Sequence, residues 1–119
     1  MEVHLERHTG FLILRVTGDL RLWGRAGTEK NPLAMLRAEP DLPGQLVLSL
    51  FGVNHLDTAG ISSIVRVVIE CTKRQVELKL VLPRGVPGEA LRRLHLFDSW
   101  PEFPEEAAAI QAAQSAAGG

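Results

Sequence analysis

The pair Asp57-Thr58 is the place in this chain where residue types and spacing most clearly allow chemistry. A short apolar run, residues 47–51, precedes the pair, and a periodic apolar segment follows it. This order predicts a buried strand, an exposed turn and a helix that begins near Asp57 and Thr58. The first N–H groups of a helix have no partner within it, and the helix dipole is positive there. A hydroxyl at this position can therefore cap the helix or carry a phosphate.

Local chemistry alone favours the simpler role for Thr58, an N-cap, which stabilises a helix by about 1 kcal/mol. Asp57 is a second cap, or a general acid or base. A single carboxylate without a histidine, lysine or metal partner at suitable spacing is weak support for catalysis. We therefore interpret Asp57 as a residue that orients the turn and contacts a partner.

The other reactive side chains form no second site in the sequence. Cys71 lies beside the apolar stripe of the expected helix, which is typical of packing rather than of a reactive thiol. No glycine-rich phosphate loop, catalytic triad or metal constellation is present, and no pair of histidines has metal-ligand spacing on a helix: they are His4, His8, His55 and His95. We expect no cofactor, no metal and no enzymatic activity.

Composition narrows the class of protein further. The chain has 119 residues, a net charge of −1, 45% hydrophobic and 23% charged residues, and one cysteine. These values are typical of one globular domain, which we place at residues 1–114 with a flexible tail at 115–119. The charge argues against binding of nucleic acid, and the apolar runs are too short for membrane insertion. Without a signal peptide or a disulfide framework, the expected location is cytoplasmic.

The elements that must position the Asp57-Thr58 turn follow from the apolar patterns. Residues 3–7 and 11–16 are predicted strands of a hairpin, followed after an irregular segment by a helix from Pro32 or a longer helix that Pro32 kinks. A strand over 45–51, a helix over 59–73 and a strand over 76–82 form a βαβ unit with parallel strands. Short helices are expected over 87–94 and from Pro104. The predicted fold is α/β, with four helices and a mixed sheet of four or five strands.

The same patterns predict which side chains face the core. The helix over 59–73 should bury one stripe of apolar residues at offsets 0, 3, 4, 7 and 8. Along 76–82, Glu77 and Lys79 mark the more polar face of the strand, and in the helix over 87–94 both Leu91 and Leu94 should point inward. The predicted stripe consists of Ile61, Ile64, Val65, Val68 and Ile69.

The run Asp57-Thr58-Ala59-Gly60-Ile61 resembles the signature of STAS domains, the fold of bacterial anti-sigma factor antagonists and of related modules in stressosomes and anion transporters. Thr17-Gly18-Asp19-Leu20 is similar to a family motif after the second strand, and Leu94 to Phe97 is similar to the family's leucine-rich helix end. The resemblance extends over residues 3–112.

The resemblance implies a regulatory binding protein rather than an enzyme. In such antagonists the position of Thr58 is the phosphoacceptor for a serine/threonine kinase, and the implied partner is an anti-sigma factor or a serine/threonine switch kinase. The oligomeric state stays open. Gly60 is interpreted either as a weak helix former or as a site of close approach by another chain's backbone. The expected partner contacts are Asp57, Ala59, Gly60, Asp19, Leu20, Arg21, Leu22 and His55.

Two positions depart from the family pattern. Antagonists commonly have an aspartate where this chain has Ser49, and often an acidic residue where it has Arg21. We expect both changes to remove negative charge near Thr58. Arg21 would then pair with a phosphate on Thr58 or with Asp57.

We consider two alternative functions. One is a STAS subunit without a phosphoswitch in a stressosome or a lipid-transporter complex, with Trp23 or Phe97 as exposed assembly contacts. Otherwise Trp23 is expected to be buried. The second is a small enzyme or nucleotide-binding domain, which no motif in the sequence supports.

Overall fold

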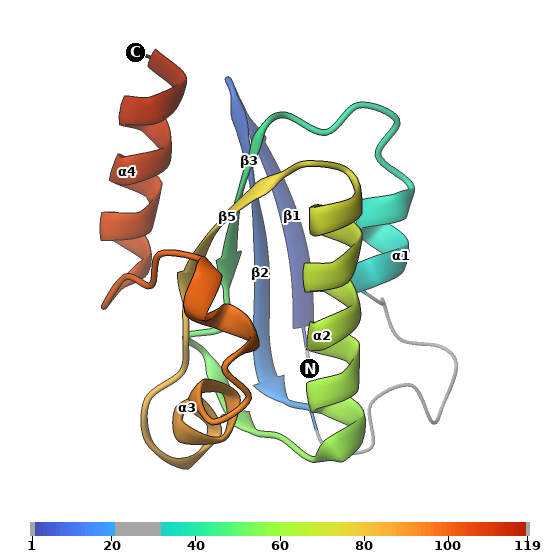
Figure 1. The fold of residues 1–119 in the computed structure, drawn as a ribbon, viewed down its shortest axis with the longest axis vertical. Helices are drawn as coiled ribbons and strands as arrows, with labels where there is room; N and C mark the ends of the chain where they lie inside the picture. Colours follow the sequence, from blue (N-terminus) through green and yellow to red (C-terminus); the bar gives the residue numbers. More distant parts are fainter. Residues whose placement is uncertain (1, 21–31, 119) are drawn as a thin grey trace.

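The computed structural model describes residues 2–20 and 32–118, and Figure 1 shows their arrangement. The strands are β1 (Glu2–His8), β2 (Phe11–Asp19), β3 (Gln45–Ser49), β4 (Val53–His55) and β5 (Glu77–Val81). The helices are α1 (Pro32–Arg37), α2 (Thr58–Lys73), α3 (Gly85–Arg92), the 3-10 helix η1 (Leu96–Ser99) and α4 (Glu106–Gly118).

The sheet is mixed and five-stranded, with the order β1-β2-β3-β5 and with β4 also paired to β2. β1 and β2 form the predicted antiparallel hairpin, which turns at Gly10 with a φ of 85°. The β3–β5 pair is parallel, as the predicted βαβ unit requires, and β2–β3 is parallel as well. The predicted α/β class, the mixed sheet and the four helices are confirmed among the described residues.

β4 is an element that the sequence did not predict. The expected strand over 45–51 ends at Ser49, and after the turn at 50–52 the chain pairs again with β2, at Gly18 and Asp19, across an irregular register. Asn54 and His55 are exposed, so β4 lacks the apolar run that marks a buried strand. It extends the sheet up to the start of α2.

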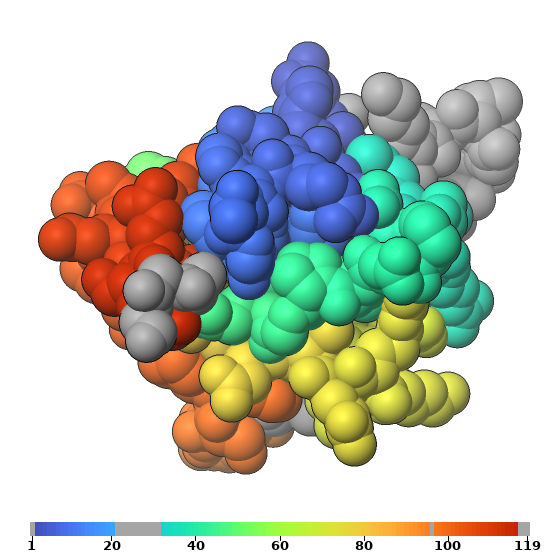
Figure 2. All heavy atoms as spheres, turned by 90° about the horizontal axis from the view of Figure 1, so that it is seen from above, coloured from blue at the N-terminus to red at the C-terminus, as the bar shows by residue number. Residues whose placement is uncertain are grey.

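Helices cover the sheet on both sides. α1 and α2 lie on one face and α4 on the other (Figure 1), and the view along the sheet separates α4 from α1 in the same way (Figure 2). β2 therefore buries Leu12 and Leu14 in one core, and Phe11 and Ile13 in the other. This explains why its sequence is apolar without alternation.

The buried stripe of α2 differs from the predicted one. Gly60, Ile64, Val67, Val68 and Cys71 are the buried positions, so Val67 is added, while Ile69 is 46% exposed. α2 carries apolar residues over a wider arc than the sheet can cover, and the pattern alone did not show which part of that arc faces the sheet. Burial of Cys71 agrees with its predicted packing role, and desolvation raises the pKa of its thiol to about 12.

Two further core predictions are wrong. Lys79 is 8% exposed rather than on a polar face, because α4 covers the second side of β5. Leu94 is 43% exposed because α3 begins at Gly85, earlier than predicted, and ends at Arg92.

The first and last helices, α1 and α4, have bounds that bear on two predictions. α1 begins at Pro32, and the alternative of a longer, kinked helix involves residues 21–31, outside the described part. α4 continues to Gly118, into the segment predicted as a tail, whose flexibility stays a prediction. Within the residues that the structure describes, no helix has the length and apolar character needed to cross a membrane.

Candidate functional site

The start of α2 is capped by Asp57 rather than by Thr58. Asp57 has an extended backbone, with φ −118° and ψ −174°, and its Oδ1 accepts a hydrogen bond of 2.9 Å from the Gly60 N–H. Thr58 is the first residue of the helix, so its predicted role as an N-cap is wrong. The carboxylate also places negative charge at the positive end of the helix, which is favourable.

The Thr58 side chain is therefore not used in the cap, and the residue is exposed together with Ala59. Both lie in the first turn of α2, at the end of the molecule where the parallel strands finish (Figure 1). Asp57 beside them is half-buried. The turn thus offers an accessible hydroxyl residue on a backbone held by a neighbouring side chain.

Gly60 is buried against the chain's own Leu20. A Cβ at Gly60 would lie 2.8 Å from the Leu20 carbonyl oxygen and 3.1 Å from the Leu20 Cβ, closer than side chains pack. A backbone does approach Gly60 closely, but it is the Leu20 backbone of the same chain and not, as expected, that of another chain. Leu20 is fully buried as well, so its expected place on the contact surface is wrong.

The other expected contact residues that the structure describes lie next to the contact between Gly60 and Leu20. The Leu20 N–H donates to the His55 carbonyl oxygen at 2.8 Å, and Asp19 lies opposite His55 across the β2–β4 pair. Asp19 is half-buried and His55 is exposed. β2 and β4 thus bring Asp19, Leu20 and His55 to the turn that begins α2. Arg21, Leu22 and Trp23 lie outside the described residues.

Ser49 lies on the other side of the sheet, where it binds α4. Its hydroxyl donates to Glu106 Oε2 at 2.7 Å, and Arg15 Nε lies 3.0 Å from both carboxylate oxygens. The hydrogen bond from Arg15, reinforced by Ser49, lowers the pKa of the Glu106 carboxyl. The expected effect of Ser49 on charge near Thr58 is therefore wrong: this residue acts on the attachment of α4. No local pattern could have predicted the contact between Arg15 and Glu106, which are 91 positions apart.

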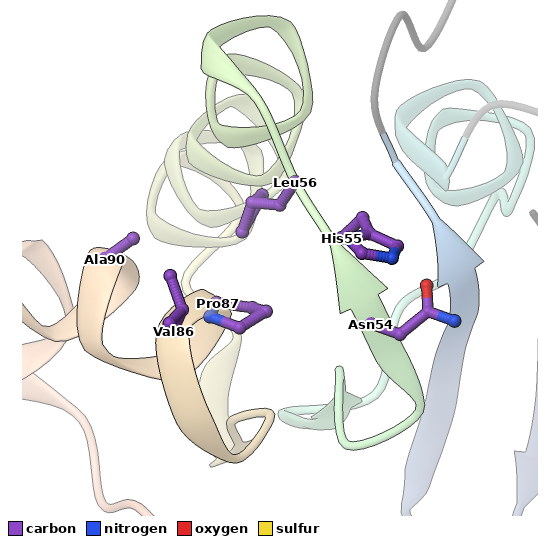
Figure 3. Close-up of a pocket in the computed structure, with 6 residues that line it drawn as sticks. All are labelled: Asn54, His55, Leu56, Val86, Pro87 and Ala90. Carbon is purple, nitrogen blue, oxygen red and sulfur yellow. The ribbon is translucent and has the colours of Figure 1, made fainter.

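A pocket of about 480 Å³ lies between the β4–α2 connection and α3 (Figure 3). Nearby, the Arg84 guanidinium lies 5.3 Å above the centre of the exposed Phe51 ring. This pocket could not be predicted from the sequence, because it forms between segments about 30 positions apart. Its lining consists of Asn54, His55, Leu56, Val86, Pro87 and Ala90.

Two of the scattered histidines, His8 and His95, have local side-chain partners. His8 stacks on Phe11 with ring centroids 4.8 Å apart, and His95 lies 3.0 Å from Asp98. Among the described residues, no group of three histidine, cysteine or acidic side chains is placed to hold a metal ion. Phe97, a candidate assembly contact, is 5% exposed, so that interpretation of it is wrong.

The fold is shared with proteins of known structure. An anti-sigma factor antagonist from Mycobacterium paratuberculosis superposes with a TM-score of 0.72 and 19% identity, covering 95% of this chain and 93% of that one. A sulfate transporter family protein from Wolinella succinogenes gives 0.69 and 20%, with coverages of 91% and 88%. The anti-sigma factor antagonist SpoIIAA in its unphosphorylated form gives 0.64 and 15%, with coverages of 95% and 98%.

The sequence itself assigns the family. None of the curated proteins compared with the sequence matches it. The family model of the STAS domain, however, matches residues 2–109, which include the whole sheet and the Asp57–Ile61 turn. The chain therefore belongs to the STAS domain family.

Proposed function

We propose that this STAS protein acts as an anti-sigma factor antagonist-like regulator that is switched by phosphorylation of Thr58. Its partner is an anti-sigma factor that is also a serine/threonine kinase, and the unphosphorylated form is the one that binds. The protein acts in the cytoplasm by binding, without catalysis. The observation that carries the proposal is an exposed threonine at the first position of α2, on a turn capped by Asp57.

The charge of a phosphate explains how the switch would work. Phosphorylation adds about −1.5 to −2 charges at neutral pH. The N-terminus of α2 favours negative charge, so the domain should stay folded. A partner that covers the turn would have to desolvate the new dianion, which costs several kcal/mol when the charge is not paired. Binding is therefore lost while the fold is kept.

The contact surface in this proposal is smaller than the sequence predicted. Thr58 and Ala59 are exposed, His55 lies beside them, and the half-buried Asp57 and Asp19 complete the surface. Gly60 and Leu20 are buried beneath this surface, in contact with each other. Arg21 and Leu22 keep their proposed role as contacts. The likeness to SpoIIAA, whose structure represents its unphosphorylated form, supports a phosphoswitch on this fold.

The second candidate is a STAS module without a switch that belongs to a larger assembly. The likeness to a sulfate transporter family protein favours this function, as do the exposed apolar residues Phe51 and Val86. In that case assembly would depend on the apolar surface and not on Thr58.

Binding measurements with matched variants separate the two candidates. A kinase partner isolated with the wild-type protein should lose binding to Thr58→Asp and keep binding to Ser62→Asp, which changes an exposed serine one turn further along α2. The melting temperatures of both variants should stay close to wild type. Incubation with this kinase and ATP should label Thr58. Phosphate found at Ser62 or Ser63 instead, or equal binding by both variants, would contradict the switch.

A further inference from the structure

β1 forms one edge of the sheet and has a neighbouring strand on one side only. It is terminal in the strand order, and within the described residues it pairs with β2 alone. The hairpin of β1 and β2 lies at the margin of the molecule, with α4 on one flank and α1 on the other (Figure 2). Such an edge offers backbone N–H and C=O groups to another strand.

The register of the hairpin decides which backbone groups point to the free edge. His8 and Phe11 flank a two-residue turn and lie opposite each other, so they exchange two hydrogen bonds. Bonded and unbonded pairs alternate along an antiparallel pair, and therefore Val3, Leu5 and Arg7 direct their N–H and C=O groups away from β2. We call these three the edge residues. Within the described part of the chain, nothing hydrogen-bonds their backbone groups.

The side chains on one face of β1 alternate between acid and base. They belong to Glu2, His4, Glu6 and His8, all of which are exposed. His4 Nε2 lies 3.5 Å from Glu2 Oε2, and the same distance separates His8 Nε2 from Glu6 Oε1. Glu6 Oε2 also lies 3.1 Å from Arg15 Nη1 on β2. The face beside the free edge therefore carries both kinds of partner for an ion pair or a charge-assisted hydrogen bond.

This alternation is self-complementary in one register. Two identical edges related by a two-fold axis run antiparallel, and their free backbone groups meet when edge residues lie opposite edge residues. With the axis at Leu5, Glu2 lies opposite His8 of the second copy, and Glu6 lies opposite His4 of the second copy. A shift of two residues in either direction keeps the backbone pairing but places glutamate opposite glutamate and histidine opposite histidine. Like charges directly opposite are destabilising, so the sequence favours the register centred on Leu5.

The other face of β1 is compatible with the same register. The two Leu5 side chains would meet at the axis, and in the single chain Leu5 is half-buried at the rim of the core. Their contact therefore buries further apolar surface. The Arg7 guanidinium binds the Glu39 carboxylate and lies 3.3 Å from the Asp41 carbonyl oxygen, so its charge is paired within the chain.

We propose that β1 pairs with β1 of a second copy of this chain, antiparallel and around a two-fold axis at Leu5. Val3 then exchanges hydrogen bonds with Arg7 of the second copy, the two Leu5 residues do so with each other, and the two sheets continue as one. Charged side chains on an edge often prevent such pairing, but here acid and base alternate and match. Neither Thr58 nor its turn takes part, so the interaction goes beyond the proposed phosphoswitch.

Sedimentation equilibrium of the full chain at neutral pH tests for this dimer. Because a single strand edge buries little surface, we expect a monomer at low micromolar concentration and a dimer toward millimolar concentration. His4→Glu and Glu6→Lys should each weaken the dimer by about fivefold or more, since each change affects two cross-strand pairs. An equimolar mixture of the two variants should recover it, because every glutamate again faces a base. Glu77→Lys, the same change at an exposed position on β5, is the control and should have no effect.

Amide hydrogen exchange tests the edge residue by residue. Raising the protein concentration from micromolar to millimolar should slow exchange at Leu5 and Arg7, whose N–H groups point to the free edge. Exchange at His4 and Glu6 should be slow at both concentrations, because these N–H groups are bound to β2.

Four results would overturn the proposal: a monomer at millimolar concentration, equal effects of Glu6→Lys and Glu77→Lys, no recovery in the mixture, or exchange that responds equally at alternate amides. Melting temperatures of the variants show that each is folded before its dimer is measured. Thr58→Asp should dimerise like wild type, so a failed phosphoswitch leaves this result intact.

Discussion

The two faces of the sheet are held by different kinds of interaction. Toward α1 and α2, the core consists of large aliphatic side chains such as Leu12, Leu48 and Ile64. Toward α4, the helix buries only the small residues Ala109 and Ala113 among its described residues, with Ile110 partly buried beside them, and the contacts at its start are polar. Since buried apolar area dominates stability, the α2 face should hold the domain together and α4 should be the helix that detaches first. The candidate site belongs to the α2 face.

Ile64→Asp should have the largest effect, because it places a charge in the core of the α2 face, where Ile64 is 2% exposed. A buried charge without a partner costs several kcal/mol, comparable with the whole stability of a domain of this size. We expect loss of the folded state by circular dichroism. The matched variant Ile69→Asp, on the same helix but 46% exposed, should fold. A folded Ile64→Asp protein would mean that another face of α2 packs on the sheet.

Gly60→Ala should have the next largest effect, because the new Cβ would meet the Leu20 carbonyl oxygen at 2.8 Å. Overpacking of this kind costs about 1–3 kcal/mol, which exceeds the gain in helix propensity. Denaturant unfolding gives the change in free energy. Gly44→Ala is the control, because a Cβ at Gly44 would have no atom within 4 Å. Equal stability of the two variants would show that α2 and Leu20 are not in close contact.

Glu106→Gln should weaken the other face by a smaller amount, about 1–2 kcal/mol, because it removes the charge from the hydrogen bonds with Arg15 and Ser49. Hydrogen exchange should accelerate at the Ala109 and Ala113 amides more than at amides of α2. Glu105→Gln, at an exposed neighbouring position, is the control. Uniform acceleration in both helices would contradict the different stabilities of the two faces.

The same carboxylate predicts how stability depends on pH. Arg15 lowers the pKa of Glu106 in the folded protein relative to its ordinary value of 4.5. The folded state therefore binds fewer protons than the unfolded state in this range, so stability decreases as the pH falls below about 4.5. Glu106→Gln should reduce this decrease in pH-dependent unfolding. An unchanged pH profile would assign the acid sensitivity to other carboxylates.

Much of the α2 face could be predicted because its signals are local. The hairpin, the β3–α2–β5 unit and the Asp57–Ile61 turn each follow from residues close in sequence. Which residue of the turn caps α2 could not be predicted, because Asp57 and Thr58 are both good caps and only the backbone conformation decides between them. Contacts between segments far apart in the sequence could not be predicted either. They are the contacts of Leu20 with Gly60, of Arg15 with Glu106, and of α3 with β4.

The smallest predicted effect distinguishes the two residues of the turn. Asp57→Ala should destabilise the domain by about 1 kcal/mol, because the Gly60 N–H loses the acceptor that caps α2. Asp57→Asn should recover most of that loss, since an asparagine side chain caps equally well. Thr58→Ala should change the melting temperature little, because Thr58 is not the cap. If Thr58→Ala were instead the more damaging change, Thr58 would be structural, and a phosphate on its oxygen would disrupt α2. The phosphoswitch therefore requires that stability depend on Asp57 and binding on Thr58.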